Sequence, residues 1–385
     1  MKKILFLAVS AILLAASCQK TEIINQAPGE SLTFAPYLGK LTKAADEAEL
    51  KDGEGHLKSQ NFYVWAYADF EDELNGKDDL DLIYDNMKGV EVKFENSAWG
   101  TKLDYYWPGQ NKKLNFFAVS GISQADASGT VVDIKINRDA SDKTKINPTL
   151  TINEFTANGQ TDLMVADFVN QAQNNDKTPT KSVNLKFRHT LSKVQFLFKT
   201  EESQSNSTEG NDVVLVQHIT VENVKTTSKL LVDANTDATT STTKPYKAKW
   251  DEPADGSNEV DLTEGYDGQE LPNKAATTDF PLDIQWIDNA KQDLTAMKLT
   301  KDATPFATWL LMPQTIYDND TQLTVKVLYL MGKRQMESVF VLNAENFSRW
   351  NENQYIRYII TLTPNKITFV PSVEDWEAKD VEMGN

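Results

Sequence analysis

An alternation of apolar and polar residues with period two recurs along this chain and constrains its fold more than any other feature. It places one set of side chains on the buried face of a β-sheet and the other set in water. Helical periodicity is confined to two short stretches, residues 44–50 and 344–350. The alternation therefore predicts an all-β protein built of antiparallel β-sandwiches. It is clearest at residues 90–94, 183–187, 323–327 and 356–362.

Three further runs are apolar on both faces, which is typical of strands covered on both sides in the centre of a sheet. They are residues 62–67, 114–119 and 309–312. A chain of 385 residues is long enough for about two domains. Each half contains an aromatic strand, a tryptophan-bearing segment and an alternating closing strand. We therefore expect an N-terminal sandwich over residues 31–188 and a C-terminal sandwich over residues 189–385.

The first residues have the layout of a secretory signal. Lys2 and Lys3 precede an apolar run over residues 4–16, which is too short for a membrane span of roughly 20 residues. Small residues lead directly into Cys18, and this arrangement distinguishes a bacterial lipoprotein signal from an ordinary one. The alternative is an ordinary signal followed by an incidental cysteine.

The lipoprotein interpretation divides the N-terminus into three parts. Residues 1–17 are the expected signal peptide, cleavage falls between Ser17 and Cys18, and residues 18–30 form a tether with a lipid on Cys18. Several acyl chains make a durable anchor, so we expect a protein attached to a membrane and not embedded in it. Cys18 is the sole cysteine, so no internal disulfide is possible.

The charge of the chain restricts its partners. Without Lys2 and Lys3, 37 basic residues remain against 56 acidic ones, a net charge of −19. Such a charge repels phosphate backbones, so nucleic acid is excluded as a partner.

Patterns that carry catalysis are absent from the sequence. It has no G-x-S-x-G, no H-E-x-x-H, no cysteine pair and no P-loop, and its three histidines lie in unrelated contexts. His189 ends an alternating strand, where a structural role is expected. We therefore predict no enzyme, no catalytic residue, no cofactor and no metal site. A glycosidase is the exception that the sequence leaves open, because its two carboxylates need to be close in space and can be any distance apart along the chain.

Two other features have competing interpretations. The acidic runs at residues 71–73, 78–81 and 318–320 lack the regular ligand spacing of a calcium loop and are interpreted as solvated loops and a turn. The aromatic cluster at residues 105–108 is either a core element or a platform on which sugar rings stack.

Several segments, taken in order, resemble the fimbrillin-like proteins, the type V pilin family. The N-terminal ones are residues 62–67, 105–108, 114–118 and 161–164. The C-terminal ones are R-H-T-L-S-K within residues 183–194, L-M-P-Q at residues 311–314, W-N-E-N-Q-Y-I-R-Y at residues 350–358 and V-E-D-W at residues 373–376.

The resemblance implies two transthyretin-like β-sandwich domains in a lipoprotein carried to the outer membrane. In pilins of this family a trypsin-like protease cuts, usually after an arginine, and removes the first strand. A strand of another subunit then fills the open groove, which is β-augmentation. Mapped on this chain, Leu32 and Phe34 mark the displaced first strand. The candidate donor strand contains Ile367, Phe369, Val373 and Trp376, and the alternative is that this strand closes its own domain.

The chain departs from the family pattern at the expected protease cleavage site. Its first arginine after the signal is Arg138, so the candidate processing site is Lys43–Ala44. A subunit that kept its first strand and its lipid would be an anchor or a terminating subunit. The leading hypothesis is a non-enzymatic surface fimbrial subunit or adhesin, polymerising with other fimbrial subunits of its own or another kind, and recognising a host or glycan ligand. The alternative is a lipid-anchored surface glycan-binding protein.

Overall fold

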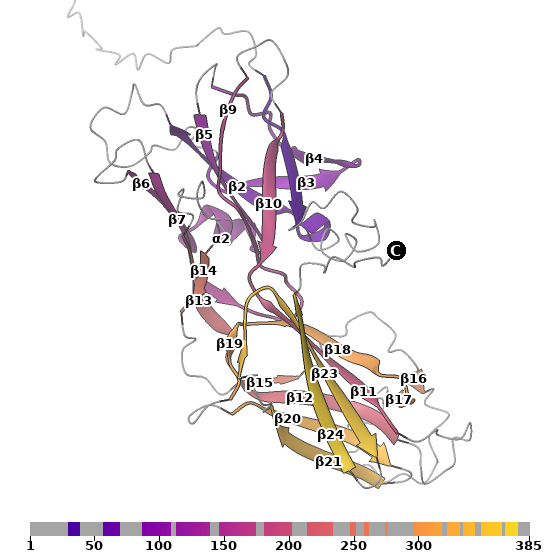
Figure 1. Ribbon diagram of the computed structural model, residues 1–385. Helices are drawn as coiled ribbons and strands as arrows, with labels where there is room; N and C mark the ends of the chain where they lie inside the picture. The colour runs from indigo at the N-terminus through magenta and orange to yellow at the C-terminus, as the bar shows by residue number, and fades with distance from the viewer. Residues whose placement is uncertain are drawn as a thin grey trace, which may run out of the picture.

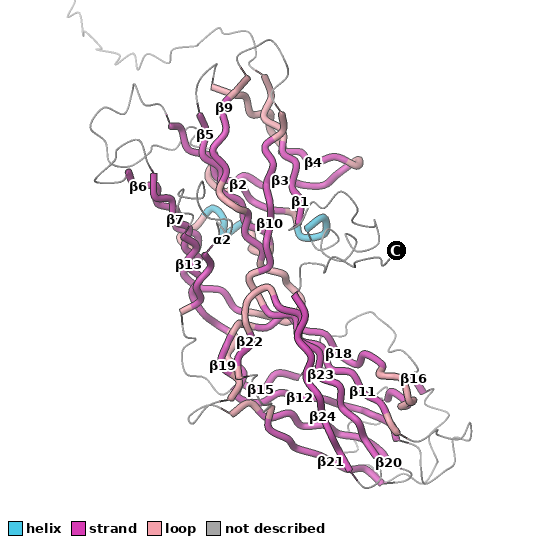
Figure 2. Tube along the Cα trace, in the orientation of Figure 1, coloured by secondary structure: helices cyan, strands magenta, loops and turns pink. Residues whose placement is uncertain are grey.

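The computed structural model forms two β-rich lobes joined end to end (Figure 1). Strands make up almost all regular structure, with helical segments at residues 57–60 and in α2 (Gln124–Ser128) beside them (Figure 2). The all-β prediction is thus confirmed, while the transthyretin-like topology stays a prediction. The structure describes residues 30–38, 57–69, 87–108, 113–138, 146–174, 181–201, 214–233, 247–251, 258–261, 274–275, 296–317, 322–331, 334–342, 348–363 and 366–375.

The N-terminal lobe contains two sheets. Sheet I has the order β1-β10-β8-β5-β2-β3-β4, with β9 on β5, and sheet II has the order β14-β13-β7-β6. The strands of sheet I are β1 (Phe34–Leu38), β2 (Phe62–Asp69), β3 (Val90–Glu95), β4 (Ala98–Thr101), β5 (Lys113–Ser120), β8 (Met164–Ala166), β9 (Val169–Ala172) and β10 (Val183–His189). Those of sheet II are β6 (Val132–Arg138), β7 (Ile146–Thr156), β13 (Thr227–Asp233) and β14 (Lys247–Trp250).

Both faces of sheet I are buried, because successive residues of its central strands enter two different cores. In β2, Trp65 packs against sheet II, whereas Phe62 and Val64 lie in a second core on the opposite face. Sheet I also curls until its two edge strands, β1 and β4, approach each other. This curled sheet encloses the second core, which we call the inner core. The two-sided apolar runs at residues 62–67 and 114–119 are therefore central strands, as predicted.

The C-terminal lobe is a sandwich of two further sheets. Sheet III has the order β18-β11-β23-β24, and sheet IV the order β16-β17-β12-β20-β21, with β15 on β12. Sheet III contains β11 (Ser192–Lys199), β18 (Thr304–Leu311), β23 (Gln354–Thr363) and β24 (Lys366–Asp375). Sheet IV contains β12 (Val214–Val224), β15 (Asn258–Asp261), β16 (Lys274–Ala275), β17 (Ala296–Lys298), β20 (Thr324–Met331) and β21 (Arg334–Val341), and a separate ribbon pairs β19 (Gln314–Thr315) with β22 (Arg349–Trp350).

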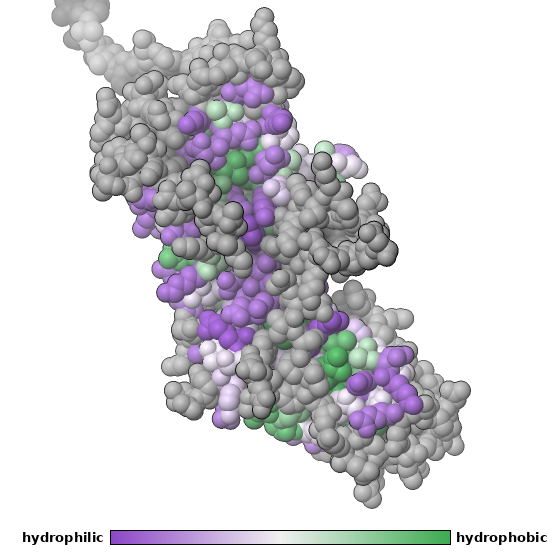
Figure 3. All heavy atoms as spheres, in the orientation of Figure 1, coloured by the Kyte–Doolittle hydropathy of each residue, from purple (hydrophilic) through white to green (hydrophobic). Residues whose placement is uncertain are grey.

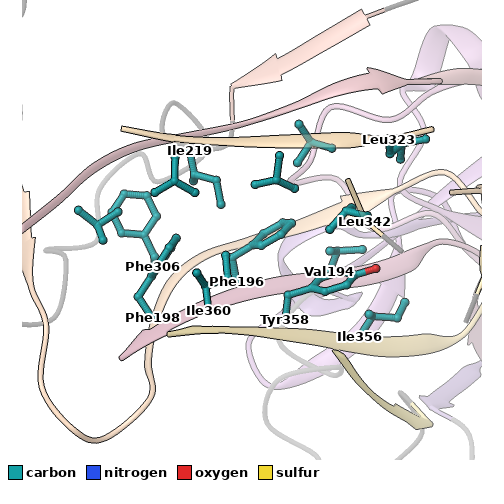
Figure 4. Packing of buried hydrophobic residues seen from close by; sticks show 14 of the residues in the cluster. Val194, Phe196, Phe198, Ile219, Phe306, Leu323, Leu342, Ile356, Tyr358 and Ile360 are labelled. Atoms are coloured by element: carbon teal, nitrogen blue, oxygen red, sulfur yellow. The ribbon is translucent and has the colours of Figure 1, made fainter. Parts of the chain in front are cut away.

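The core of this lobe is rich in aromatic rings. Side chains of β11 and β23 point from sheet III toward sheet IV (Figure 4). Phe196 and Tyr358 stack with ring centroids 5.2 Å apart, and the buried Trp350 indole donates a 2.9 Å hydrogen bond to the Tyr358 hydroxyl. Burial raises the pKa of that hydroxyl, because the phenolate would lose its hydration.

We expect Tyr358→Phe to lower the free energy of unfolding by about 1–3 kcal/mol, because the buried Trp350 N–H loses this acceptor while the ring is retained. Urea denaturation measures the change. Tyr329→Phe is the matched control, since its hydroxyl lies 3.2 Å from Ser338 on the edge hairpin of sheet IV. An equal loss in both variants would contradict the assignment.

The chain crosses between the lobes more than once. β10 leads into β11 through Thr190 and Leu191, and β12 leads back into β13 through Lys225 and Thr226. Strands β13 and β14 pair with each other and with β7, so residues 227–250 complete the sandwich of the N-terminal lobe. The change of lobe after β10 lies between His189 and Ser192, and the return of residues 227–250 was not anticipated; the division into two sandwich domains at residues 188 and 189 stays a prediction.

Hydrogen bonds hold the crossing segments, and Gln314 and Asn353 among their donors and acceptors belong to motifs that carry the family resemblance. Gln314 accepts from the Lys225 main-chain N–H at 2.9 Å and donates to its carbonyl at 3.0 Å. The Trp250 indole donates to the Thr190 carbonyl at 2.7 Å, and the Asn353 N–H donates to the Leu191 carbonyl at 3.0 Å. We call this region the lobe junction.

The lobe junction also explains a difference from the sequence analysis. The apolar run at residues 309–312 was expected in a central strand, but β18 lies at the edge of sheet III. Its second apolar face is covered by the N-terminal lobe, where Leu310 and Met312 belong to the core between sheets I and II. Where a single helical turn was expected at residues 344–350, the described residues Arg349 and Trp350 form β22.

Candidate functional site

The candidate site is the seam of sheet I, which is filled by the first strand of the chain. β1 pairs in parallel with β10, from Phe34 opposite Val183 to Leu38 opposite Phe187. On its other side β1 faces the approaching β4, and in the described part of the sheet no ladder of main-chain hydrogen bonds joins these two strands. A strand at such an edge is held by one neighbour, and its removal leaves the rest of the sheet paired.

The side chains of this segment complete the inner core. Leu32 and Phe34 are each 7% exposed. The Phe34 ring makes edge-to-face contacts with Phe62 and Phe116, at centroid distances of 6.5 and 6.1 Å. Phe34 therefore occupies a socket with aromatic walls, and an empty socket would expose these walls to water.

A second contact holds the residues before β1. The Leu32 N–H donates to the Tyr105 carbonyl at 2.7 Å, and the Trp107 N–H donates to the Glu30 carbonyl at 2.9 Å. Tyr105 and Trp107 are themselves buried in the inner core. Residues 30–38 are thus clamped between the aromatic segment and β10. The cluster at residues 105–108 is a core element, and these two rings offer no face on which a sugar can stack.

The outer side of β1 is polar. The Thr33 and Ser182 hydroxyls lie 2.8 Å apart, and Tyr37 lies beside the ion pair of Arg188 with Asp167, whose atoms approach to 2.7 Å. Burial raises the pKa of Tyr37, the Asp167 carboxylate raises it further, and Arg188 opposes both. The outer side therefore supplies polar contacts, while the inner side supplies apolar burial.

The arrangement is suited to holding an extended strand. It offers the main-chain groups of β10 on one side and a row of apolar pockets below. No group of three or more histidine, cysteine, aspartate or glutamate side chains gathers to hold a metal among the described residues. His189 is buried and its Nδ1 lies 2.7 Å from the Asp162 carboxylate at the lobe junction, which is a structural position.

The other residues predicted for the site lie elsewhere. Ile367, Phe369 and Val373 belong to β24, which pairs with β23 at the edge of sheet III. In this structure the C-terminal strand pairs within its own domain, and its role as a donor strand stays a prediction. Ser17, Cys18, Lys43, Ala44 and Trp376 lie outside the described residues.

Sequence reasoning found β1 but missed both of its contacts. The alternation of Leu32 and Phe34 indicated a strand, whereas a parallel partner separated by about 150 residues leaves no local signal. The clamp by residues 105–107 uses main-chain groups, which any side chain can supply. The available signal was the density of aromatic residues there, which indicated a core.

Where Figure 3 colours the described residues, hydrophilic areas predominate and the apolar areas are small and separated. Within the part of the chain that the structure describes, no helix is long and apolar enough to cross a membrane.

A family profile and several solved structures match this chain. A sequence profile described as fimbrillin-like matches residues 42–376. Among solved structures, the chain is similar to a fimbrial protein from Bacteroides vulgatus, with 18% identity, a TM-score of 0.54, and coverage of 90% of this chain and 100% of that one. It is also similar to the tip fimbrial protein Mfa3 of Porphyromonas gingivalis, with 11% identity, a TM-score of 0.36, and coverage of 83% and 96%. A comparison with curated proteins finds no match.

Proposed function

The chain belongs to the fimbrillin-like family, and from this premise we propose that it is a non-enzymatic subunit of a surface fimbrium that assembles by protease-triggered strand exchange. The observation that carries the proposal is the position of β1, a short edge strand that fills an apolar seam and has one hydrogen-bonded neighbour in the described sheet. Other fimbrial subunits are the partners of this function, and the outer surface of the cell is its location.

The exchange follows from the chemistry of the seam. A cut after Lys43 releases a segment that contains β1 and Cys18. The main-chain groups of β10 and the sockets of Leu32 and Phe34 then lose their partners. A strand of a second subunit that restores the ladder and the apolar contacts is bound by both.

Cleavage also decides what the lipid does. The signal over residues 1–17 and Cys18 support export as a lipoprotein that reaches the outer membrane. If the chain is cut after Lys43, the lipid delivers the subunit and is then discarded. If the chain stays whole, the lipid keeps the protein at the membrane, as an anchor subunit requires.

A trypsin-like protease is expected to convert the purified protein from a monomer into oligomers whose subunits begin at Ala44. N-terminal sequencing identifies the cut, and size-exclusion chromatography follows assembly. Because a cut after Lys40 or Lys51 would also release β1, the matched control replaces Lys40, Lys43 and Lys51 together with glutamine, and it should remain monomeric under the same treatment. Protein that is cut at this site yet stays monomeric would refute assembly by strand exchange.

A further inference from the structure

A groove on the N-terminal lobe shares no residue with the seam. Its volume is about 700 Å³, which lies within the range of clefts that bind small ligands, roughly 300–1,000 Å³. Segments that are distant in the sequence form its walls: the helical turn at residues 57–60, the start of α2, the residue before β6, and the end of β7 with the loop after it. The fold therefore assembles a cleft here that no single segment contains.

Side chains of the groove are fixed by hydrogen bonds to the main chain. The Gln60 amide accepts from the Asp162 N–H at 2.7 Å and donates to the Asp162 carbonyl at 2.9 Å. The Asn158 Oδ1 accepts from the N–H groups of Gln160 and Thr161 at 3.0 and 2.8 Å. A ligand binds such side chains without the entropic cost of ordering them.

Polar groups of both kinds remain available in the groove. Asp126 uses one carboxylate oxygen to cap α2, and its other oxygen has no hydrogen bond to the described residues, nor has either oxygen of Glu154. These oxygens are acceptors. The donors are the second N–H of the Gln60 side chain and the hydroxyl of Thr161, whose oxygen accepts from Asn158 at 2.8 Å. The groove therefore presents acceptors and donors together.

Charge and apolar surface narrow the class of ligand. Among the described residues that line the groove, none is lysine, arginine or histidine, whereas Asp126 and Glu154 are acidic, so an anionic ligand is repelled. Ile122 and Val131 are half-buried and pack against the core between sheets I and II, so they add an apolar surface to the groove. The groove thus suits a ligand that is uncharged, rich in hydroxyl groups and apolar on one face.

Neutral sugars meet these conditions, and we propose that the groove binds a neutral glycan. Each sugar hydroxyl both donates and accepts, so it pairs with the carboxylates as well as with the N–H and O–H donors. The C–H face of a pyranose ring lies on Ile122 and Val131. A lysine or arginine side chain of a peptide only donates, so it would cover the Gln60 and Thr161 donors without pairing them, which costs free energy.

The glycan site is independent of assembly. The apolar residues of the groove belong to the core between sheets I and II, whereas Leu32 and Phe34 fill the inner core on the opposite face of sheet I. Loss of β1 therefore leaves the walls of the groove in place. The site adds an adhesive activity to the proposed assembly, and it is present both in the uncut monomer and in an assembled subunit.

Binding is measured with the purified mature chain, uncut and carrying Cys18→Ser, on an array of neutral oligosaccharides of hexoses and N-acetylhexosamines. Sialylated and sulfated oligosaccharides form a second arm, and a lysine-rich peptide forms a third. Glu154→Gln and Asp126→Asn each replace a carboxylate of the groove by an amide of the same shape. Glu95→Gln is the matched control, because it removes the same charge from an exposed position outside the groove. Circular dichroism verifies that every variant is folded.

We expect the neutral oligosaccharides to be bound, with an affinity about ten-fold lower in each groove variant and unchanged in Glu95→Gln, because each groove variant loses a charged acceptor for sugar hydroxyls. No binding on the neutral arm, an equal loss in the control, or binding confined to the anionic or the peptide arm would overturn the inference. The proposed assembly is scored separately, by the oligomers that form after proteolysis, so failure of the glycan site leaves it standing.

Discussion

Replacing Phe34 with alanine is expected to lower the free energy of unfolding of the uncut protein by about 3–5 kcal/mol. The ring is 7% exposed and fills the socket formed with Phe62 and Phe116, so its removal leaves a cavity that these two rings cannot close from their central strands. Urea denaturation of the uncut protein measures the loss.

Two comparisons distinguish stability lost at the seam from a general loss of stability. Tyr37→Ala removes a ring from the outer side of the same strand, where only part of it is buried, and should cost about 1 kcal/mol. After proteolysis and removal of the released segment, the Phe34→Ala variant and the original protein have the same sequence and must unfold alike. A difference that persists would mean that the released segment remains bound in the seam.

Gly159→Ala is expected to destabilise the protein by about 2–5 kcal/mol, because it adds left-handed backbone strain to overpacking. Gly159 has a φ of +83°, and a Cβ there would lie 2.2 Å from Cε3 of Trp309. Its carbonyl also accepts the Leu310 N–H at 2.9 Å, so the backbone cannot retreat without breaking a bond between the lobes. Differential scanning calorimetry would show a lower melting temperature.

The matched control for this substitution is Gly100→Ala in β4, where an added Cβ meets nothing within 4 Å; it should be neutral or slightly stabilising. A second variant isolates the contact with the ring. Trp309→Leu clears space above Gly159, so adding Gly159→Ala to it should cost less than adding the same substitution to the original protein. Strict additivity of the two changes would show that the Trp309 ring is not the obstacle.

The sequence was sufficient to predict many of the strands. The period-two alternation at residues 90–94, 183–187 and 323–327 corresponds to β3, β10 and β20, because burial of one face imposes that pattern directly. Two-sided apolar runs gave the central strands β2 and β5 for the same reason. The run at residues 309–312 led to a wrong prediction of a central strand. A strand with two buried faces has the same apolar sequence whether its second face is covered by its own domain or by another lobe.

The order of the strands in the sheets could not be predicted from the sequence, because pairing between distant segments produces no local sequence pattern. β13 shows perfect alternation, but nothing in residues 227–233 indicates that their partner is β7 and not a strand of the second lobe. Three of the family motifs, residues 183–194, 311–314 and 350–358, were found separately, yet their meeting at the lobe junction depends on main-chain partners such as Lys225 and Leu191. For the site, alternation identified the segment of β1, and the seam that receives it became visible only in the fold.

The return of residues 227–250 to sheet II has a consequence for biosynthesis. An exported chain of the kind proposed here leaves the membrane N-terminus first, and β6 and β7 lack the strands that complete their sheet until residue 250 has crossed. Until then the apolar face of sheet I that carries Trp65 and Phe117 is only partly covered. The order of emergence therefore delays closure of the first lobe until well over half of the chain has crossed the membrane.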